Sequence, residues 1–225
     1  MIKGKLYGVG VGPGSADLLT LRAVKIIGRT KCLAVPKTKG EKNAALDIVK
    51  GIVNTDGKEI LYMDFPMTAD KAVLDGSYRE KAVMIESILD KGEDVCFITL
   101  GDVSIYSTFS YIEPLIREKG FETEICPGVP SFCAVGASLN TSLTVKNEPL
   151  HIIPAAYGGI ERLMGLNGTK VFMKAGKHVE EIFKCAEAKG FKAMGIENCT
   201  MGNERKVFEN AESFGYFTTI VVKGE

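Results

Sequence analysis

The first half of the chain alternates short apolar runs with segments of helical periodicity. The run Val-Cys-Phe-Ile-Thr-Leu at 95–100 is almost continuously apolar, as in a strand buried on both faces of a parallel sheet. Between such runs, apolar residues recur every three or four positions, and Ser15 can cap the first helix. The pattern predicts strands over 5–11, 31–36, 59–63, 95–100 and 121–126, and helices over 16–28, 43–53, 70–91 and 105–119.

A series of strands and helices of this kind predicts an α/β domain with a parallel sheet and right-handed crossovers. From Pro127 the pattern changes, because a small-residue segment is followed by five short strands and only two further helices. The strands are predicted at 150–155, 169–173, 192–197, 206–209 and 216–223, and the helices near 158–165 and 178–189. We therefore expect two α/β domains, 1–126 with a parallel sheet and 127–225 with a mixed sheet.

The net charge and the numbers of cysteines and histidines limit which kinds of partner and metal site we expect. The 225 residues carry 28 basic and 28 acidic side chains, which provides no field to attract nucleic acid or an anionic membrane. No apolar run approaches the roughly 20 residues that span a bilayer. Six cysteines without a Cys-x-x-Cys pair and only two histidines predict free thiols and no metal site. We expect a cytoplasmic protein with no nucleic-acid or membrane partner.

The segment at 7–14 is unusually rich in glycine and would suggest a dinucleotide. That fingerprint requires Gly-x-Gly-x-x-Gly, but the third position is Pro13 in one frame and Ser15 in the other. No Gly-Lys-Ser/Thr triplet follows for a phosphate loop. An NAD-linked or nucleotide-hydrolysing enzyme is thus disfavoured, and comparing NAD with S-adenosylhomocysteine as ligands would test it.

Three glycine-bearing loops, at 10–14, 100–108 and 127–132, each follow a predicted strand. Ligands of open α/β sheets bind beyond the carboxyl ends of strands. Taken singly, each loop is an ordinary turn, and Tyr106 and Phe132 are core aromatics. Ser107, Thr108 and Ser131 could equally be helix caps.

Taken together, the three segments 9–23, 99–112 and 127–139 resemble the tetrapyrrole methylases, which use S-adenosylmethionine to methylate corrin and sirohaem precursors. The resemblance extends over essentially the whole chain, including Ile-Ile-Pro-Ala at 152–155 and Thr-Thr-Ile-Val-Val-Lys at 218–223. It implies a cofactor held in a cleft between two α/β domains, a tetrapyrrole substrate and a homodimer. The glycines would then let the backbone approach these ligands closely.

The same resemblance implies which residues contact S-adenosylmethionine. For Asp102 an equally good alternative is that it caps the following helix. The implied contacts are Pro13, Leu100, Gly101, Asp102, Ile105, Tyr106, Ser131, Phe132, Pro154, Ala155, Cys199, Thr218 and Thr219.

Within the family, the segments 65–68, 99–102 and 107–112 are most similar to precorrin-2 C-20 methyltransferases. Ser15 stands where most members carry Asp, and Val35-Pro36 replaces the Tyr-Asp pair of members that methylate uroporphyrinogen. We therefore expect methylation of a C-20 meso carbon, with or without cobalt in the ring. The alternatives are another ring position, a diphthamide or ribosomal-RNA methylase, and a tetrapyrrole- or metal-carrying protein that is not an enzyme.

The sequence indicates no catalytic base. Neither His151 nor His178 has a neighbouring pattern that suggests an activated pair, and methyl transfer to an enamine-like carbon needs little acid–base chemistry. Lys37 and Lys39 could meet substrate carboxylates, although a solvated charged run is the better explanation of this lysine-rich segment.

Overall fold

The structure is a computed structural model, and we describe residues 3–37, 43–207 and 213–224 of it. The chain divides into two compact units, residues 1–130 and 131–225, each built around its own five-stranded sheet. The expected α/β class with two sheets is confirmed.

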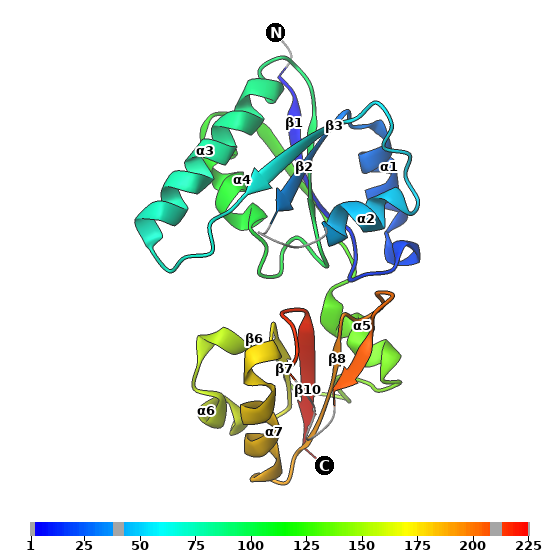
Figure 1. Cartoon of the computed structure of the whole chain (residues 1–225), viewed down its shortest axis with the longest axis vertical. Coiled ribbons are helices and arrows are strands. Elements are labelled where there is room, and N and C mark those ends of the chain that lie inside the picture. Colours follow the sequence, from blue (N-terminus) through cyan, green and yellow to red (C-terminus); the bar gives the residue numbers. More distant parts are fainter. Residues whose placement is uncertain (1–2, 38–42, 208–212, 225) are drawn as a thin grey trace. The chain divides into compact units, whose positions relative to one another are not determined.

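The first sheet is entirely parallel, with the strand order β3-β2-β4-β1-β5. Its strands are β1 Lys5–Gly10, β2 Cys32–Lys37, β3 Glu59–Asp64, β4 Val95–Thr99 and β5 Glu122–Cys126. Alternate side chains of the central strands enter two separate hydrophobic cores, so Ile98 packs on one face and Phe97 on the other. Helices α1 and α2 cover the first of these faces, and α3 and α4 cover the second (Figure 1).

The helices of this unit begin later than the sequence predicts at two places. The predicted helix over 16–28 begins instead with a short 3-10 turn, Ala16–Leu18, and the α-helix itself, α1, spans Leu21–Arg29. Ser15 makes no side-chain cap, whereas the Thr20 hydroxyl accepts the Ala23 N–H at 3.1 Å. The predicted cap at Ser15 is therefore wrong, because extended backbone at Leu19 and Thr20 separates the two turns.

Helix α4 spans Phe109–Glu118 rather than 105–119. Gly101 and Tyr106 both have positive φ, which keeps the preceding residues in a loop. The Ser107 hydroxyl accepts the Phe109 N–H at 3.2 Å and so closes the helix start. The other two helices, α2 Ala44–Lys50 and α3 Lys71–Leu89, begin at the side-chain caps Asn43 and Asp70.

The second sheet has the order β6-β7-β10-β8-β9 and is mixed, as predicted. Strands β6 and β7 are parallel, and β10 runs antiparallel to both β7 and β8. The strands are β6 Leu150–Pro154, β7 Thr169–Met173, β8 Lys192–Glu197, β9 Arg205–Val207 and β10 Thr218–Lys223. The helices are α5 Ser131–Ser138, α6 Ile160–Met164 and α7 Val179–Glu187. Residues 208 and 209 of the predicted strand 206–209 lie outside the described residues.

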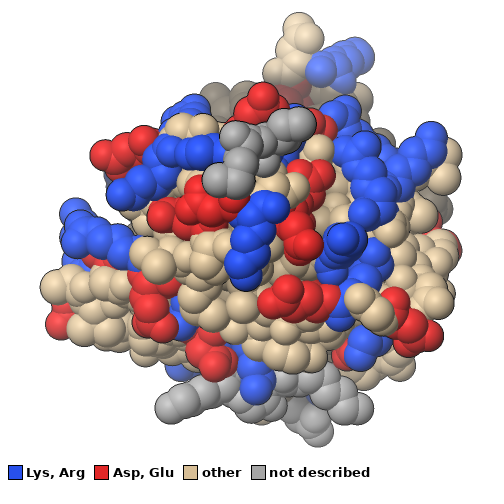
Figure 2. Space-filling model, turned by 90° about the horizontal axis from the view of Figure 1, so that it is seen from above, with Lys and Arg blue, Asp and Glu red and all other residues tan. Residues whose placement is uncertain are grey.

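Figure 2 shows Lys and Arg side chains interspersed with Asp and Glu over one face of the molecule. This mixture agrees with the balanced formal charge of the chain. In the part of the chain that the structure describes, no helix is long and apolar enough to cross a membrane.

Candidate functional site

The strand order of the first sheet identifies where a ligand would bind. The connection after β1 leads to β2 on one side, and the connection after β4 leads to β5 on the other side. Because β1 and β4 are neighbours, while α1 and α4 cover opposite faces of the sheet, the two connections leave adjacent strand ends toward opposite faces. In doubly wound sheets such a switch point opens a crevice beyond the carboxyl ends of the strands. The predicted contacts in the loops after β1 and β4 are Pro13, Leu100, Gly101, Asp102, Ile105 and Tyr106.

These two loops are joined directly by backbone hydrogen bonds. Gly101 N–H donates to the Gly12 carbonyl at 2.7 Å, and Gly12 N–H donates back to the Gly101 carbonyl at 3.2 Å. Both glycines have positive φ, +79° for Gly12 and +76° for Gly101. A side chain at either position would strain this bridge.

The loop after β5 packs on the same bridge. A Cβ on Gly10 would lie 2.6 Å from the Gly101 carbonyl oxygen and 2.7 Å from the Gly128 nitrogen. A Cβ on Gly128 would likewise meet the Gly101 carbonyl oxygen. Gly8 instead makes room for the ring of Phe109, 2.6 Å from its would-be Cβ. For Gly8, Gly10 and Gly128 the close contact is thus with the protein itself, whereas the approach of the glycine backbone to the ligands stays a prediction.

Asp102 ties the second and third loops together. It is 9% exposed, and its Oδ1 accepts the Ser104 N–H at 2.8 Å while its Oδ2 accepts the Gly128 N–H at 2.8 Å. The Ser104 hydroxyl also donates to Oδ1. The carboxylate therefore fixes the geometry of both loops rather than capping α4.

Tyr106 presents its ring from this loop in an unusual conformation. Its φ is +49° and its side chain is 46% exposed, whereas Leu100, Ile105 and Pro13 are half-buried or buried. A bulky residue with positive φ is strained, and strain of this kind clusters at functional sites. Burial raises the pKa of the Tyr106 phenol, so it stays protonated at neutral pH.

In the second unit, the strand directions place the predicted residues along one edge of the sheet. This edge is formed by the carboxyl ends of β6, β7 and β8. Strands β6, β7 and β8 run the same way, so their carboxyl ends lie beside the first residues of β10. Thr219 pairs with Met173, which in turn pairs with Pro154, and Thr218 pairs with Glu197 at the end of β8. The structure thus brings together Pro154, Ala155, Cys199, Thr218 and Thr219, which lie far apart in the sequence.

Three further residues at this edge have left-handed backbone. Lys174 follows β7 with φ +57°, and Asn198 and Thr200 follow β8 with φ +52° and +64°. Left-handed backbone is a marked outlier for β-branched Thr200. The sequence carries no signal for this strain, and its location again indicates a functional edge.

Helix α5 adds Ser131 and Phe132 to the second unit. Phe132 is 7% exposed and Ser131 is half-buried at the first turn. The Ser138 hydroxyl lies 3.6 Å from the Cys199 sulfur. Burial raises the pKa of the Cys199 thiol, which keeps it neutral and unsuited to act as a nucleophile.

The histidines are occupied by local contacts. His151 Nε2 lies 2.8 Å from the Asn167 carbonyl oxygen, and His178 Nδ1 lies 3.5 Å from a Glu181 carboxylate oxygen. Among the described residues, no group of three His, Cys, Asp or Glu could hold a metal ion. Lys37 is exposed at the end of β2, and Lys39 lies outside the described residues.

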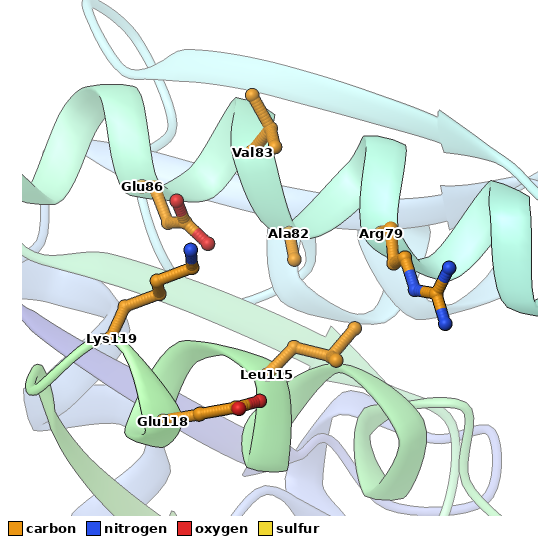
Figure 3. Close-up of a pocket in the computed structure, with 7 residues that line it drawn as sticks. All are labelled: Arg79, Ala82, Val83, Glu86, Leu115, Glu118 and Lys119. Carbon is orange, nitrogen blue, oxygen red and sulfur yellow. The ribbon is translucent and has the colours of Figure 1, made fainter.

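A pocket of about 430 Å³ lies elsewhere, between α3 and α4 (Figure 3). Leu115 and Ala82 face each other across it, and the Lys119 and Glu86 side chains point toward one another. It is lined by Arg79, Ala82, Val83, Glu86, Leu115, Glu118 and Lys119. None of these residues belongs to the strand-end loops, so the pocket is not the predicted cofactor site.

Solved structures define the class of fold. The chain is similar to a cobalt precorrin-4 methyltransferase, with a TM-score of 0.76 at 17% identity over 98% of this chain and 94% of that chain. It is also similar to a uroporphyrin-III C-methyl transferase from Thermus thermophilus complexed with S-adenyl homocysteine, with a TM-score of 0.72 at 15% identity over 98% and 97%. The protein therefore has the two-sheet α/β fold of these methyltransferase structures.

The sequence itself then establishes the family. Residues 5–214 match the sequence profile of the Tetrapyrrole (Corrin/Porphyrin) Methylases, and the chain belongs to this family. It is 35% identical to a probable cobalt-precorrin-2 C(20)-methyltransferase of Methanocaldococcus jannaschii, over 94% of this chain and 90% of that protein. It is 27% identical to a precorrin-2 C(20)-methyltransferase of a Sinorhizobium species, over 98% and 96%.

Proposed function

We propose that the protein transfers a methyl group from S-adenosylmethionine to the C-20 meso carbon of precorrin-2 or its cobalt-containing form, a step in the synthesis of the corrin ring. The observation that carries this proposal is the 35% identity to a relative named for this reaction, extending over 94% of the chain. The identity to a relative named for the metal-free substrate is lower, at 27%. This difference favours the cobalt form as the first substrate to test.

We propose that the residues predicted from the sequence contact S-adenosylmethionine. Two features of the structure support this assignment. The loops after β1, β4 and β5 meet at the switch point of the first sheet, where bare glycine backbone and the half-exposed Tyr106 lie. In the second unit, Pro154, Ala155, Cys199, Thr218 and Thr219 share one sheet edge with strained backbone.

The chemistry proposed asks the protein mainly for positioning. Bound S-adenosylmethionine supplies an electrophilic methyl on its sulfonium, and the electrons of the broken S–C bond stay on sulfur. The meso carbon between two pyrrole-like rings is already enamine-like, so the loops hold it in line with that methyl. After the new C–C bond forms, the proton on the meso carbon is lost to water. Positioning of this kind can supply roughly 7–11 kcal/mol of barrier reduction. The neutral Cys199 thiol and the locally bonded histidines fit a reaction without an activated base.

We further propose a homodimer that works in the cytoplasm. A reducing compartment fits the six free cysteines, three of which, Cys32, Cys96 and Cys126, are buried in the first unit. Burial raises the pKa of the Cys32 thiol to about 12, so that thiol is inert toward oxidation.

The test is methylation by the purified protein. Precorrin-2 and cobalt-factor II are each incubated with S-adenosylmethionine that carries a labelled methyl, and NMR locates the label on the product ring. Label at C-20 is expected. Label at another ring position would assign a different reaction of the family. Pigment binding without cofactor and without label would show a tetrapyrrole-binding protein that is not an enzyme.

A further inference from the structure

Three aromatic rings form a continuous array on the first unit, and we call Phe65, Tyr78 and Tyr111 the aromatic ladder. The Tyr78 and Tyr111 rings are stacked, with centroids 4.8 Å apart and planes inclined by 2°. Phe65 lies on the other side of Tyr78, with centroids 5.9 Å apart. Phe65 and Tyr78 pack against the hydrophobic core beneath α3 and α4, whereas Tyr111 is 57% exposed.

The ladder lies at the end of the first sheet where the strands have their carboxyl ends. Phe65 directly follows the carboxyl end of β3, and Tyr111 lies in the first turn of α4, immediately after the loop at 100–108. The segment that carries Phe65 is held by two caps, since the Thr68 hydroxyl accepts the Asp70 N–H and Asp70 caps α3. These bonds order the chain between Phe65 and the start of α3.

Two of the three sequence segments that most resemble C-20 methyltransferases meet in this array. One is 65–68, which contains Phe65, and the other is 107–112, which contains Tyr111. They are joined in space by Tyr78, which belongs to neither segment and which nothing in the sequence singles out. The structure thus gives a physical link between the two segments.

The chemistry of the surface fits a flat ligand with carboxylate side chains. Tyrosine rings offer a π face and a hydroxyl donor at the same place. Burial, with smaller contributions from Tyr111 and Asp75, raises the pKa of Tyr78, so its hydroxyl keeps its proton.

We propose that the aromatic ladder is the surface on which the tetrapyrrole substrate stacks, with Tyr111 in contact with the ring system and Tyr78 and Phe65 holding Tyr111 in place. This inference rests on the proposed function and adds the residues that select the substrate. Pre-organised rings cost little entropy when they bind, which is why a stacked pair serves better than a single mobile tyrosine.

The test separates stacking from general damage. In Tyr111→Leu the aromatic face is lost, and in Tyr111→Phe it is kept. We expect the KM for cobalt-factor II to rise about tenfold in Tyr111→Leu and to stay within about twofold in Tyr111→Phe, because one aromatic contact is worth about that factor. The affinity for S-adenosylhomocysteine is expected to stay unchanged in both. Ile52→Ala, at an exposed apolar residue just after α2, is the matched control and should change neither quantity.

Two further measurements make the result decisive. Titration with uroporphyrin, a stable tetrapyrrole with carboxylate side chains, should show the same ranking of the variants without turnover. If wild type binds uroporphyrin but methylates neither substrate, the proposed function fails while the titration still tests the ladder. An unchanged KM and uroporphyrin affinity in Tyr111→Leu would overturn the inference. The inference would also be overturned if Tyr111→Leu became monomeric while its affinity for uroporphyrin stayed unchanged. That result would assign the ladder to contact with a second copy of the chain.

Discussion

Asp102 is a buried carboxylate whose two oxygens are both engaged by the chain. The resemblance to the family implies a cofactor contact, and the residue type equally suits a helix cap. The structure instead shows hydrogen bonds to Ser104 and Gly128, which hold two strand-end loops together. We infer that Asp102 affects the cofactor mainly by positioning the backbone around Gly101.

Replacing Asp102 with Asn tests this role. The amide has only one oxygen, so either the Ser104 or the Gly128 N–H loses its acceptor, at a cost of about 1–3 kcal/mol. We expect affinity for S-adenosylhomocysteine to fall about tenfold in calorimetry, with a modest loss of thermal stability. Asp17→Asn, at an exposed position, is the control and should bind normally. Unchanged affinity in the Asp102 variant would remove the carboxylate from the site.

The two histidines yield an opposite prediction. Because both are engaged by local contacts, changing either His151 or His178 to Gln should slow single-turnover methylation far less than the hundredfold typical of a lost acid–base group. Replacing Tyr106 or Phe132 should slow it more. The affinity of each of the four variants for the cofactor is measured first. A histidine variant that binds cofactor normally yet transfers methyl a hundredfold more slowly would contradict the positioning account.

Among the elements, α1 shows how a cap decides where a helix begins. Ser15 precedes apolar residues at helical spacing, so the sequence predicts that the helix starts there. Only the Thr20 hydroxyl accepts a backbone N–H at the first turn of α1. Tertiary packing chose the later start, because Leu19 turns into the core formed with α2.

We expect Thr20→Ala to lower the free energy of unfolding by about 1 kcal/mol, the usual effect of losing an N-cap hydroxyl. Thr108→Ala is a matched control, because Thr108 is also an N-cap residue but makes no side-chain cap. Urea unfolding followed by circular dichroism measures both. Equal stability losses in the two variants would show that the Thr20 bond is not the stabilising feature.

For the whole molecule, the testable expectation is the oligomeric state. Half-exposed apolar side chains such as Val73 and Val83 are available on the first unit, and closed two-fold dimers are the commonest oligomers. We expect sedimentation at micromolar concentration to give about twice the chain mass of 24.3 kDa. A monomer alone under those conditions would exclude the dimer.

The sequence by itself determined the alternation of strands and helices, the parallel first sheet and the mixed second sheet. Apolar periodicity is a local property of each segment. A run such as 95–100 therefore predicts a buried strand without any information about the neighbouring segments. The family followed from three loop segments whose spacing is also visible in the chain.

Only the tertiary structure decided which residues meet. Strand order, set by crossovers, placed Gly10, Gly101 and Gly128 within contact of one another and gathered Thr218 and Cys199 at one edge. The strain at Thr200 and the stacking of Tyr78 on Tyr111 left no trace in the sequence. The physical reason is that contacts between residues distant in the chain depend on strand order and packing, which no local pattern encodes.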